Sequence, residues 1–288
     1  MIVMNLRNLA SIVAAASLAV ACNSEDKPKG KPKSPTAPAG STAAQSGSAK
    51  PDTSGTTKPA GDNGGKKGNG VIKGTVSFSG DVPKMGVPKA RAKADVCKDS
   101  EVSYNAVVVA DGKLKDVLVS IAPDQLEGHS ASGDVVIDQK ACMYSPRIAG
   151  AMPEQKILIS NSDPTLHNVN ASLGAETLFN SPQAKGAAQL TKSFEEIGVH
   201  RLKCDVHSWM RAFIVVTDNP FYAATGADGT YTIKGVPDGT WKLEAWHSQY
   251  GKKTGTATVK GGAVTTDFSY SASDPEPEEN KGELNDLF

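Results

Sequence analysis

Three side chains with metal-binding chemistry lie within one seven-residue segment. Cys204, His207 and Met210 provide a thiolate, an imidazole and a thioether. Soft sulfur ligands favour Cu(I) and imidazole suits Cu(II), so a copper site that transfers electrons combines both kinds of donor. Such a site also needs a second imidazole, and its bond to the thioether is long and weak. His167 follows the strongly apolar run 156–160 and is well placed to supply that imidazole.

Three other interpretations of these residues stay open. One cysteine and two histidines could bind Zn(II), although structural zinc sites usually use closely spaced pairs of cysteines or histidines and rarely recruit methionine. Cys204 and His207 could act as a catalytic nucleophile and base, but Met210 would then have no role. The whole set could also be ordinary core residues. We favour copper, because it alone uses all the donor types.

Residues 204–211 resemble the short ligand loop of amicyanin, a cupredoxin, in which Cys-x-x-His-x-x-Met is followed by Arg. The sequence His167-Asn168-Val169 also resembles the His-Asn-Val element that precedes this loop in cupredoxins. The resemblance spans residues 130–218. It implies a compact Greek-key sandwich with one type 1 (blue) copper.

By this resemblance, Cys204, His167 and His207 are the equatorial copper ligands, and Met210 is the axial ligand. The loop departs from amicyanin at Val206 and Ser208, where amicyanin has prolines. The ligand types are unaffected by this difference, whereas the stiffness of the loop depends on it.

The sequence lacks the ligand patterns of other kinds of copper site, which narrows the possible copper chemistry further. None of the five histidines forms a His-x-His or His-Cys-His pair, so the sequence lacks ligands for a trinuclear or a substrate-binding copper. Cys204 is the only cysteine in its loop, which excludes a copper pair bridged by two thiolates. One copper with four protein ligands leaves no open position for a substrate. We therefore expect an electron carrier and not an enzyme.

The first residues predict export. Residues 1–21 combine Arg7, an apolar stretch and small residues near the end, which is typical of a secretory signal peptide. Cleavage would fall before Cys22, and residues 18–22 resemble a bacterial lipobox. A lipid on Cys22 would anchor the protein in the cell envelope, facing the periplasm or the cell surface. The alternative is a free secreted protein with an incidental thiol.

Two segments are predicted to be disordered. Residues 22–70 are rich in Pro, Gly, Ser, Thr, Ala and Lys, and too few large apolar side chains remain to offset the entropy of ordering. We interpret them as a tether. Residues 271–288 carry six acidic residues against Lys281 and predict a solvated tail, with docking to a basic partner as the alternative.

Two cysteines remain after Cys22 and Cys204 are assigned. Cys97 and Cys142 make one pair in an exported protein, so we expect a disulfide between them. A buried free thiol at either position is the alternative, because sequence gives no distance. The formal net charge of zero argues against nucleic-acid binding, which requires a basic face.

The part after residue 70 predicts short strands joined by turns. Asp-Gly or Gly-Gly pairs occur at 111–112, 228–229, 238–239 and 261–262, and such pairs are typical of hairpins. Apolar and polar residues alternate between these turns, as in strands with one buried face. No amphipathic helix of ten or more residues is evident. The class is therefore all-β, with a Greek-key cupredoxin sandwich and a second small β-sandwich module.

This second module resembles a carboxypeptidase regulatory-like (transthyretin-like) domain. Residues 221–246 resemble the middle of that domain, and residues 71–80 and 113–121 resemble its opening strands. We therefore expect residues 71–129 and 219–270 to complete one sandwich, with the copper domain 130–218 inserted between them. A larger cupredoxin followed by a small module is the alternative.

These observations predict a membrane-anchored type 1 copper protein that transfers single electrons in the cell envelope. Its partners would be redox proteins such as a cytochrome or a dehydrogenase. A copper storage or delivery protein is the alternative, although the sequence lacks the Met-rich or His-rich tracts of copper handlers. A non-redox binding lipoprotein on the cell surface is a third possibility.

Overall fold

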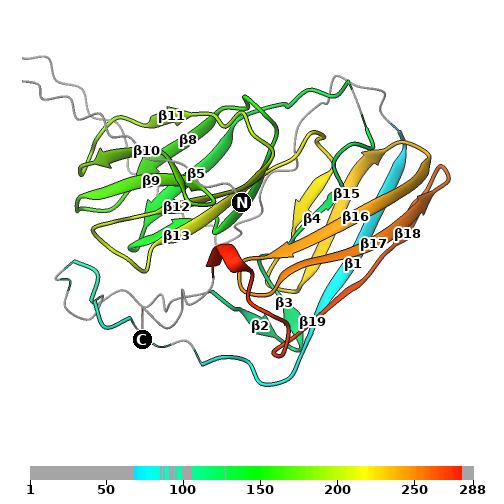
Figure 1. Ribbon diagram of the computed structural model, residues 1–288, viewed down its shortest axis with the longest axis horizontal. Helices are drawn as coiled ribbons and strands as arrows, with labels where there is room; N and C mark the ends of the chain where they lie inside the picture. The colour runs from blue at the N-terminus through cyan, green and yellow to red at the C-terminus, as the bar shows by residue number, and fades with distance from the viewer. Residues whose placement is uncertain are drawn as a thin grey trace, which may run out of the picture. The chain divides into compact units, whose positions relative to one another are not determined.

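The computed structural model describes residues 68–84, 86, 88–90, 94, 96–98, 106–126 and 128–280. These residues fall within one compact unit, Thr53–Phe288. Their regular structure consists of β-strands and one short 3-10 helix, η2 (Glu278–Asn280), which confirms the all-β class (Figure 1). The predicted signal peptide, Cys22, nearly all of the tether and residues 281–288 lie outside the described residues.

One sandwich, called here the central sandwich, contains β5 to β13. Its five-stranded sheet has the order β10-β9-β12-β13-β7, and its four-stranded sheet has the order β11-β8-β5-β6. β13 pairs with β7, and β5 with β8, in parallel, whereas the other pairs are antiparallel. The strands are β5 (Val135–Lys140), β6 (Met143–Ser145), β7 (Ile148–Ala151), β8 (Ile157–Asn161), β9 (His167–Leu173), β10 (Glu176–Gln183), β11 (Leu190–Lys192), β12 (Gly198–Lys203) and β13 (Arg211–Val216).

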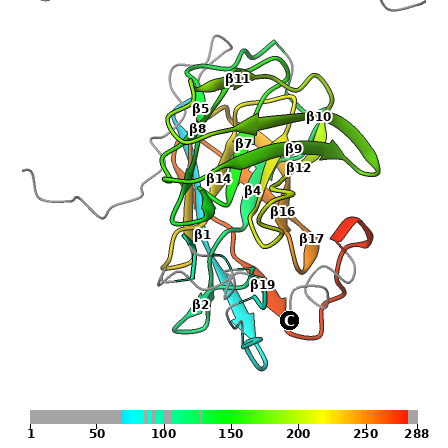
Figure 2. The same cartoon turned by 90° about the vertical axis from the view of Figure 1, so that its left-hand side faces the viewer.

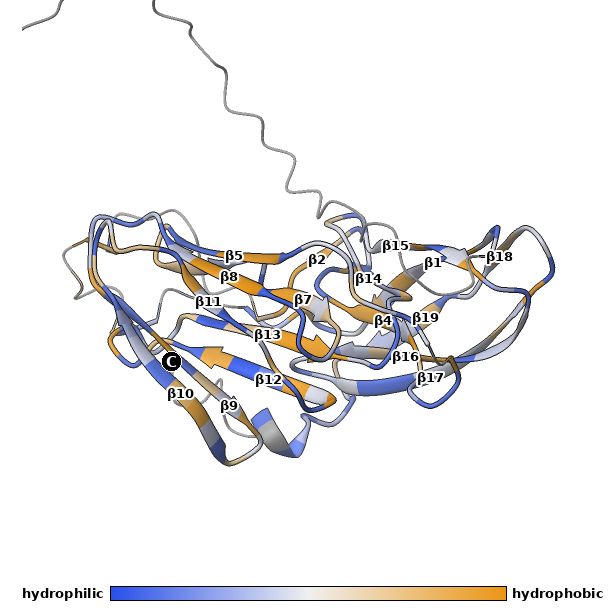
Figure 3. Cartoon of the chain, turned by 90° about the horizontal axis from the view of Figure 1, so that it is seen from above, coloured by the Kyte–Doolittle hydropathy of each residue, from blue (hydrophilic) through white to orange (hydrophobic). Residues whose placement is uncertain are grey.

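The core of the central sandwich lies between these two sheets. Alternating residues of β8, such as Ile157 and Ile159, are buried in it together with Leu202 of β12. Apolar stretches of β8 and β13 can be followed in Figure 3. Cys97 and Ala106 also belong to this core, so it extends beyond residues 130–218.

The remaining strands form a second sandwich, called here the flanking sandwich. In one sheet β1 pairs with β15, β18, β19 and β3, and β3 pairs with β2. The other sheet has the order β14-β4-β16-β17. The strands are β1 (Gly70–Ser79), β2 (Val109–Ala110), β3 (Lys113–Leu114), β4 (Leu118–Ile121), β14 (Tyr222–Ala224), β15 (Thr230–Val236), β16 (Gly239–His247), β17 (Gly251–Val259), β18 (Ala263–Thr265) and β19 (Phe268–Ser271).

The flanking sandwich combines segments from before and after the central one. Residues 70–75 of β1 pair with residues 230–236 of β15, and β4 lies between β14 and β16. The chain enters and leaves the central sandwich at neighbouring points, because Asp124 N donates a 2.7 Å hydrogen bond to Asp218 Oδ2. An inserted domain would produce this pattern, although the domain boundaries themselves stay a prediction.

Residues 113–121 do not form one strand. β3 pairs with β2 in one sheet and β4 joins the opposite sheet, so the chain crosses the sandwich between them. Asp116 takes a positive φ of 61° at this crossing, and its N–H donates to Thr225 O. Aspartate adopts this left-handed conformation more readily than most residues other than glycine do.

The two sandwiches share a small apolar cluster formed by Leu118, Ile148, Phe213 and Trp246. β14 of the flanking sandwich lies against β7 of the central one (Figure 2). A Cβ on Gly150 would collide with the ring of Tyr222, so this contact depends on glycine. Among the described residues, no helix has the length and apolar character needed to cross a membrane.

Candidate metal centre

The ligand loop closes tightly between two paired strands. β12 ends at Lys203 opposite Arg211, the first residue of β13. Cys204 N donates to Met210 O at 3.1 Å, and Met210 N donates to His207 O at 2.9 Å. The short connection therefore keeps all three predicted ligands at one end of the five-stranded sheet.

His167 reaches the same end from β9. β9 runs antiparallel to β12, with Asn170 opposite Lys203, so the start of β9 lies beside the end of β12. Asn168 fixes this arrangement, because its Oδ1 accepts hydrogen bonds from Asp205 N at 2.6 Å and Val206 N at 3.3 Å. The structure thus brings His167, Cys204 and His207 together.

The three donor atoms form a compact triangle. His167 Nδ1 and His207 Nδ1 are 2.8 Å apart, and Cys204 Sγ lies 3.9 Å from the first and 3.8 Å from the second. The point equidistant from these atoms is about 2.1 Å from each, close to the usual metal bond lengths to imidazole nitrogen and thiolate sulfur. The triangle is therefore the right size for a transition-metal ion.

The centre is enclosed by protein. His167, Cys204 and Met210 are fully buried, and His207 is only 7% exposed. Met210 belongs to the same buried cluster as Cys204 and Trp209, and its role as the axial ligand stays a prediction. Such burial excludes water from the donors.

Electrostatics favour the metal-binding form of the thiol. Burial alone would raise the pKa of Cys204, but hydrogen bonds with His167 and His207 outweigh it and lower this pKa to about 6. The thiolate is the form that binds metals. Burial would lower the pKa of His167, but its hydrogen bonds to Asp163 and Cys204 raise it to about 8. A metal ion entering this site would therefore displace a proton from His167.

Asp163 contacts a candidate ligand, and the sequence analysis did not select it. Its Oδ2 lies 2.8 Å from His167 Nε2, on the side of the ring away from the donor triangle. A carboxylate bonded to the outer nitrogen orients an imidazole ligand and raises its basicity. The signal available in the sequence was the aspartate four residues before His167.

The other predicted site residues have different positions. Cys97 and Cys142 form a disulfide, with Cα atoms 5.8 Å apart, and Cys142 lies on the hairpin between β5 and β6. Cys204 is buried and forms no disulfide, so its sulfur is available to bind a metal. Cys22 lies outside the described residues.

Two exposed apolar side chains flank the centre. Leu166 is 46% exposed and Val206 is 53% exposed, and each directly precedes a candidate histidine ligand. A polar cluster lies beside them, in which the Asp205 carboxylate accepts hydrogen bonds from the amides of Asn168, Asn170 and Asn180. Burial would raise the pKa of Asp205, but hydrogen bonds from Asn170, Lys203 and the other amides lower it to about 2.

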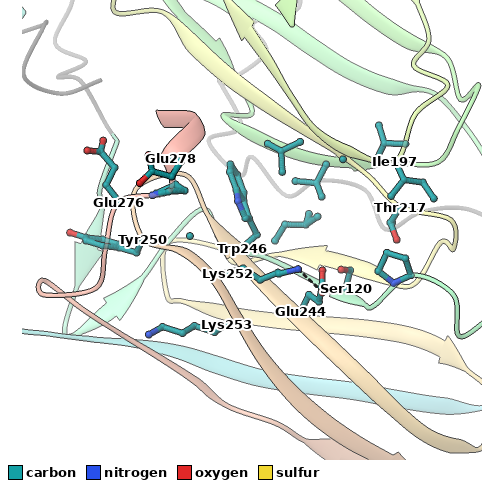
Figure 4. Close-up of a pocket in the computed structure, with 18 of the residues that line it drawn as sticks. Ser120, Ile197, Thr217, Glu244, Trp246, Tyr250, Lys252, Lys253, Glu276 and Glu278 are labelled. Carbon is teal, nitrogen blue, oxygen red and sulfur yellow. Dashed lines mark hydrogen bonds and ion pairs between the residues drawn. The ribbon is translucent and has the colours of Figure 1, made fainter. Parts of the chain in front are cut away.

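A groove lined by residues of both sandwiches lies elsewhere. It has a volume of about 810 Å³, includes Trp246 and Tyr250, and shares no residue with the donor triangle (Figure 4). Its lysines already have partners, because Lys252 pairs with Glu244 at 2.8 Å and Lys253 with Asp274 at 2.7 Å. The candidate chemistry therefore resides in the buried centre and not in this groove.

No family model and no curated protein matches the sequence. The solved structures that it resembles include cupredoxins. A purple cupredoxin from Nitrosopumilus maritimus is 25% identical, with 29% of this chain and 100% of that chain covered and a TM-score of 0.27. A proline-to-glycine variant of amicyanin in the reduced Cu(I) form is 23% identical, covering 30% of this chain and 85% of that chain, with a TM-score of 0.27. A methionine-to-alanine variant of amicyanin in the Cu(I) form is 21% identical, covering 35% and 98%, also with a TM-score of 0.27.

Proposed function

We propose that this protein is a type 1 copper protein that carries single electrons. The observation that supports it is the buried triangle of His167 Nδ1, His207 Nδ1 and Cys204 Sγ, with edges of 2.8 to 3.9 Å. When bound, copper would supply one-electron chemistry by alternating between Cu(I) and Cu(II). His167, Cys204 and His207 would hold it, with Met210 as the weak fourth ligand.

The chain's own residues suit this role in two ways. Hydrogen bonds from the loop backbone to Asn168 hold the ligand loop against β9. The protein itself therefore fixes the positions of the donors, so little rearrangement would accompany a change of charge. The low exposure of the donors also keeps solvent and small substrates away from the centre. This enclosure supports an electron carrier over an enzyme.

Redox partners would approach over Leu166 and Val206. These exposed apolar residues lie next to His167 and His207 in sequence, so contact there brings a partner close to the ligands. A cytochrome or a dehydrogenase in the cell envelope is the proposed class of partner. A lipid on Cys22, followed by the tether, would keep the protein at the membrane.

Copper storage or delivery is the second candidate function, since a buried thiolate binds Cu(I) well. A delivery protein has to release its metal to a partner. The full burial of Cys204 and the fixed ligand loop both oppose release, and they favour the electron carrier.

Absorption spectroscopy of the copper-loaded protein tests this function. We expect one copper per chain and an intense visible band from the Cys204 thiolate to Cu(II), which Cys204→Ser abolishes. Cys22→Ser is the matched control, because Cys22 is not one of the proposed ligands and its replacement should leave the band unchanged. Persistence of the band in Cys204→Ser would exclude Cys204 as the ligand. Rapid loss of copper to a mild chelator would favour delivery instead.

A further inference from the structure

Asp163 contacts more than the histidine. It is 7% exposed and follows β8, where its N–H donates a 3.0 Å hydrogen bond to Asn161 Oδ1. Its Oδ2 lies 2.8 Å from His167 Nε2. Its carboxylate also accepts hydrogen bonds from Ala141 N at 2.7 Å and Cys142 N at 2.8 Å. One buried carboxylate thus holds a candidate ligand and the β5–β6 hairpin together.

The hairpin needs this support. Ala141 and Cys142 have φ values of 54° and 57°. Residues other than glycine, asparagine and aspartate rarely adopt this left-handed region. Such residues persist only where their surroundings fix them. Here the Asp163 carboxylate fixes the two successive N–H groups, and the disulfide to Cys97 fixes the side chain of Cys142.

Cys142 is also connected to the ligand loop. Its carbonyl oxygen accepts a 3.0 Å hydrogen bond from Trp209 Nε1, and the Trp209 ring lies 5.2 Å from the His207 ring. The backbone of Cys142 is therefore hydrogen-bonded to Asp163 through its N–H and to Trp209 of the ligand loop through its C=O. Its N–H reaches His167 through Asp163, and its C=O reaches the segment that carries Cys204 and His207.

We propose that Asp163 is a positioning residue that couples the metal centre to the Cys97–Cys142 disulfide. This inference rests on the proposed metal-binding function. With the disulfide intact, the hairpin presents two fixed N–H groups, the carboxylate is held, and His167 keeps Nδ1 directed at the metal. Reduction frees the hairpin, loosens the carboxylate and weakens metal binding. Because coupling between two equilibria is reciprocal, bound metal must stabilise the disulfide in turn.

Zn(II) is the probe for the first test, because it has no redox chemistry of its own. We compare its affinity, by competition with a chelator, in the full chain and in Cys97→Ser/Cys142→Ser. Loss of the disulfide should weaken binding by about 5-fold to 150-fold, the usual range of coupling between sites. Asp163→Asn should weaken it by about 10-fold to 100-fold, as expected for loss of a partner that orients a ligand. Asp116→Asn is the matched control, because Asp116 is 8% exposed and lies in the flanking sandwich.

The reciprocal test measures how fast a water-soluble phosphine reduces the disulfide. In this reaction the phosphine takes one oxygen atom from water and becomes a phosphine oxide, and Cys97 and Cys142 become thiols. Reduction should be several-fold slower in the zinc-loaded parent than in the metal-free parent. In Asp163→Asn, zinc should give no protection even when the site is saturated.

The outcomes separate this inference from the function on which it rests. Parental zinc affinity in Asp163→Asn, or equal reduction rates with and without zinc in the parent, would overturn the coupling. If Asp163→Asn does not fold, Ala141→Gly/Asp163→Asn replaces it, because glycine accepts the left-handed φ without help from the carboxylate. That double variant should fold and still bind zinc weakly; full affinity would show that Asp163 only supports the hairpin. A parent that binds zinc but gives no coloured copper form would refute the proposed function and leave the coupling testable.

Discussion

At the scale of single residues, the centre is defined by what surrounds one thiol. Cys204 lies within 4 Å of two ring nitrogens, and its Sγ also accepts a 3.4 Å hydrogen bond from His207 N. These contacts outweigh the cost of burying a thiolate and lower its pKa. A structural cysteine in an apolar core would behave in the opposite way, with a raised pKa and little reactivity.

Met210→Leu tests the axial position. Leucine has a similar volume, so the free energy of unfolding should change by less than about 1.5 kcal/mol. The protein should still bind copper and keep its colour. Its reduction potential should rise, because the oxidised state loses a donor that it needs more than the reduced state does. Cyclic voltammetry measures this shift.

Met143→Leu is the matched control for that measurement. Met143 is buried in the same core but lies on β6, outside the ligand loop, and its replacement should leave the potential unchanged. Complete loss of copper from Met210→Leu would make Met210 a structural ligand. An unchanged potential would show that its sulfur does not face the metal.

His247 gives the flanking sandwich a pH-dependent stability. It is fully buried and stacked on Tyr250, and burial together with the charge of Arg147 lowers its pKa to about 3. Its contribution is fully present above the unfolded-state pKa of about 6.5 and decreases as the pH falls. As the pH falls below about 6.5, the free energy of unfolding should decrease by up to about 1.4 kcal/mol for each pH unit.

Urea unfolding between pH 7 and pH 4 measures this effect. His247→Phe keeps a ring in the stack and removes the titrating group, so its free energy of unfolding should fall less steeply with pH. An identical slope in parent and variant would show that His247 is not the group responsible.

At the scale of elements, the sequence predicted strands better than it predicted their partners. The ligand loop was recognisable because Cys204, His207 and Met210 lie at fixed short spacings, and the antiparallel pair β12–β13 follows from the alternation beside it. The split of residues 113–121 was not predictable, because β3 and β4 pair with strands of different sheets, and the types of residue along the segment do not specify those partners. Asp163 was missed for a similar reason, since its three partners lie on two different segments.

Gly150→Ala tests the contact between β7 and β14. The added methyl group would collide with the ring of Tyr222, so we expect the protein to lose about 1 to 3 kcal/mol of stability through overpacking. Chemical denaturation measures the loss. Gly262→Ala is the matched control, because a Cβ there would meet no atom within 4 Å. Equal stability of the two variants would show that the contact adapts without cost.

At the scale of the whole molecule, the chain interrupts one sandwich to build another. Asp124 bonds to Asp218, and Ile121 N donates to Phe221 O, so the entry and exit of the central sandwich are adjacent. Turn pairs and alternation predicted short strands, and the two family resemblances predicted that these strands form two sandwiches. The disulfide partners could be proposed by counting, but their link to the metal centre depended on the path of the chain in three dimensions.

Excision of the central sandwich tests the insertion. A chain in which a short Gly-Ser linker joins residue 124 to residue 218 should keep the flanking β-structure, because both of its sheets remain complete. It should be less stable than the parent, since Leu118 and Trp246 lose their partners Ile148 and Phe213. Circular dichroism during thermal unfolding should show a cooperative transition. A molten or unfolded product would mean that the flanking sandwich requires the central one.

A crystal structure of the copper-loaded protein, with anomalous scattering recorded at the copper absorption edge, tests the central claim most directly. We expect one copper peak inside the triangle, bonded to Nδ1 of His167, Nδ1 of His207 and Sγ of Cys204, each at about 2.0 to 2.3 Å. Met210 sulfur should be the more distant fourth neighbour. A copper bound elsewhere, or one that leaves Cys204 or either histidine uncoordinated, would contradict the account.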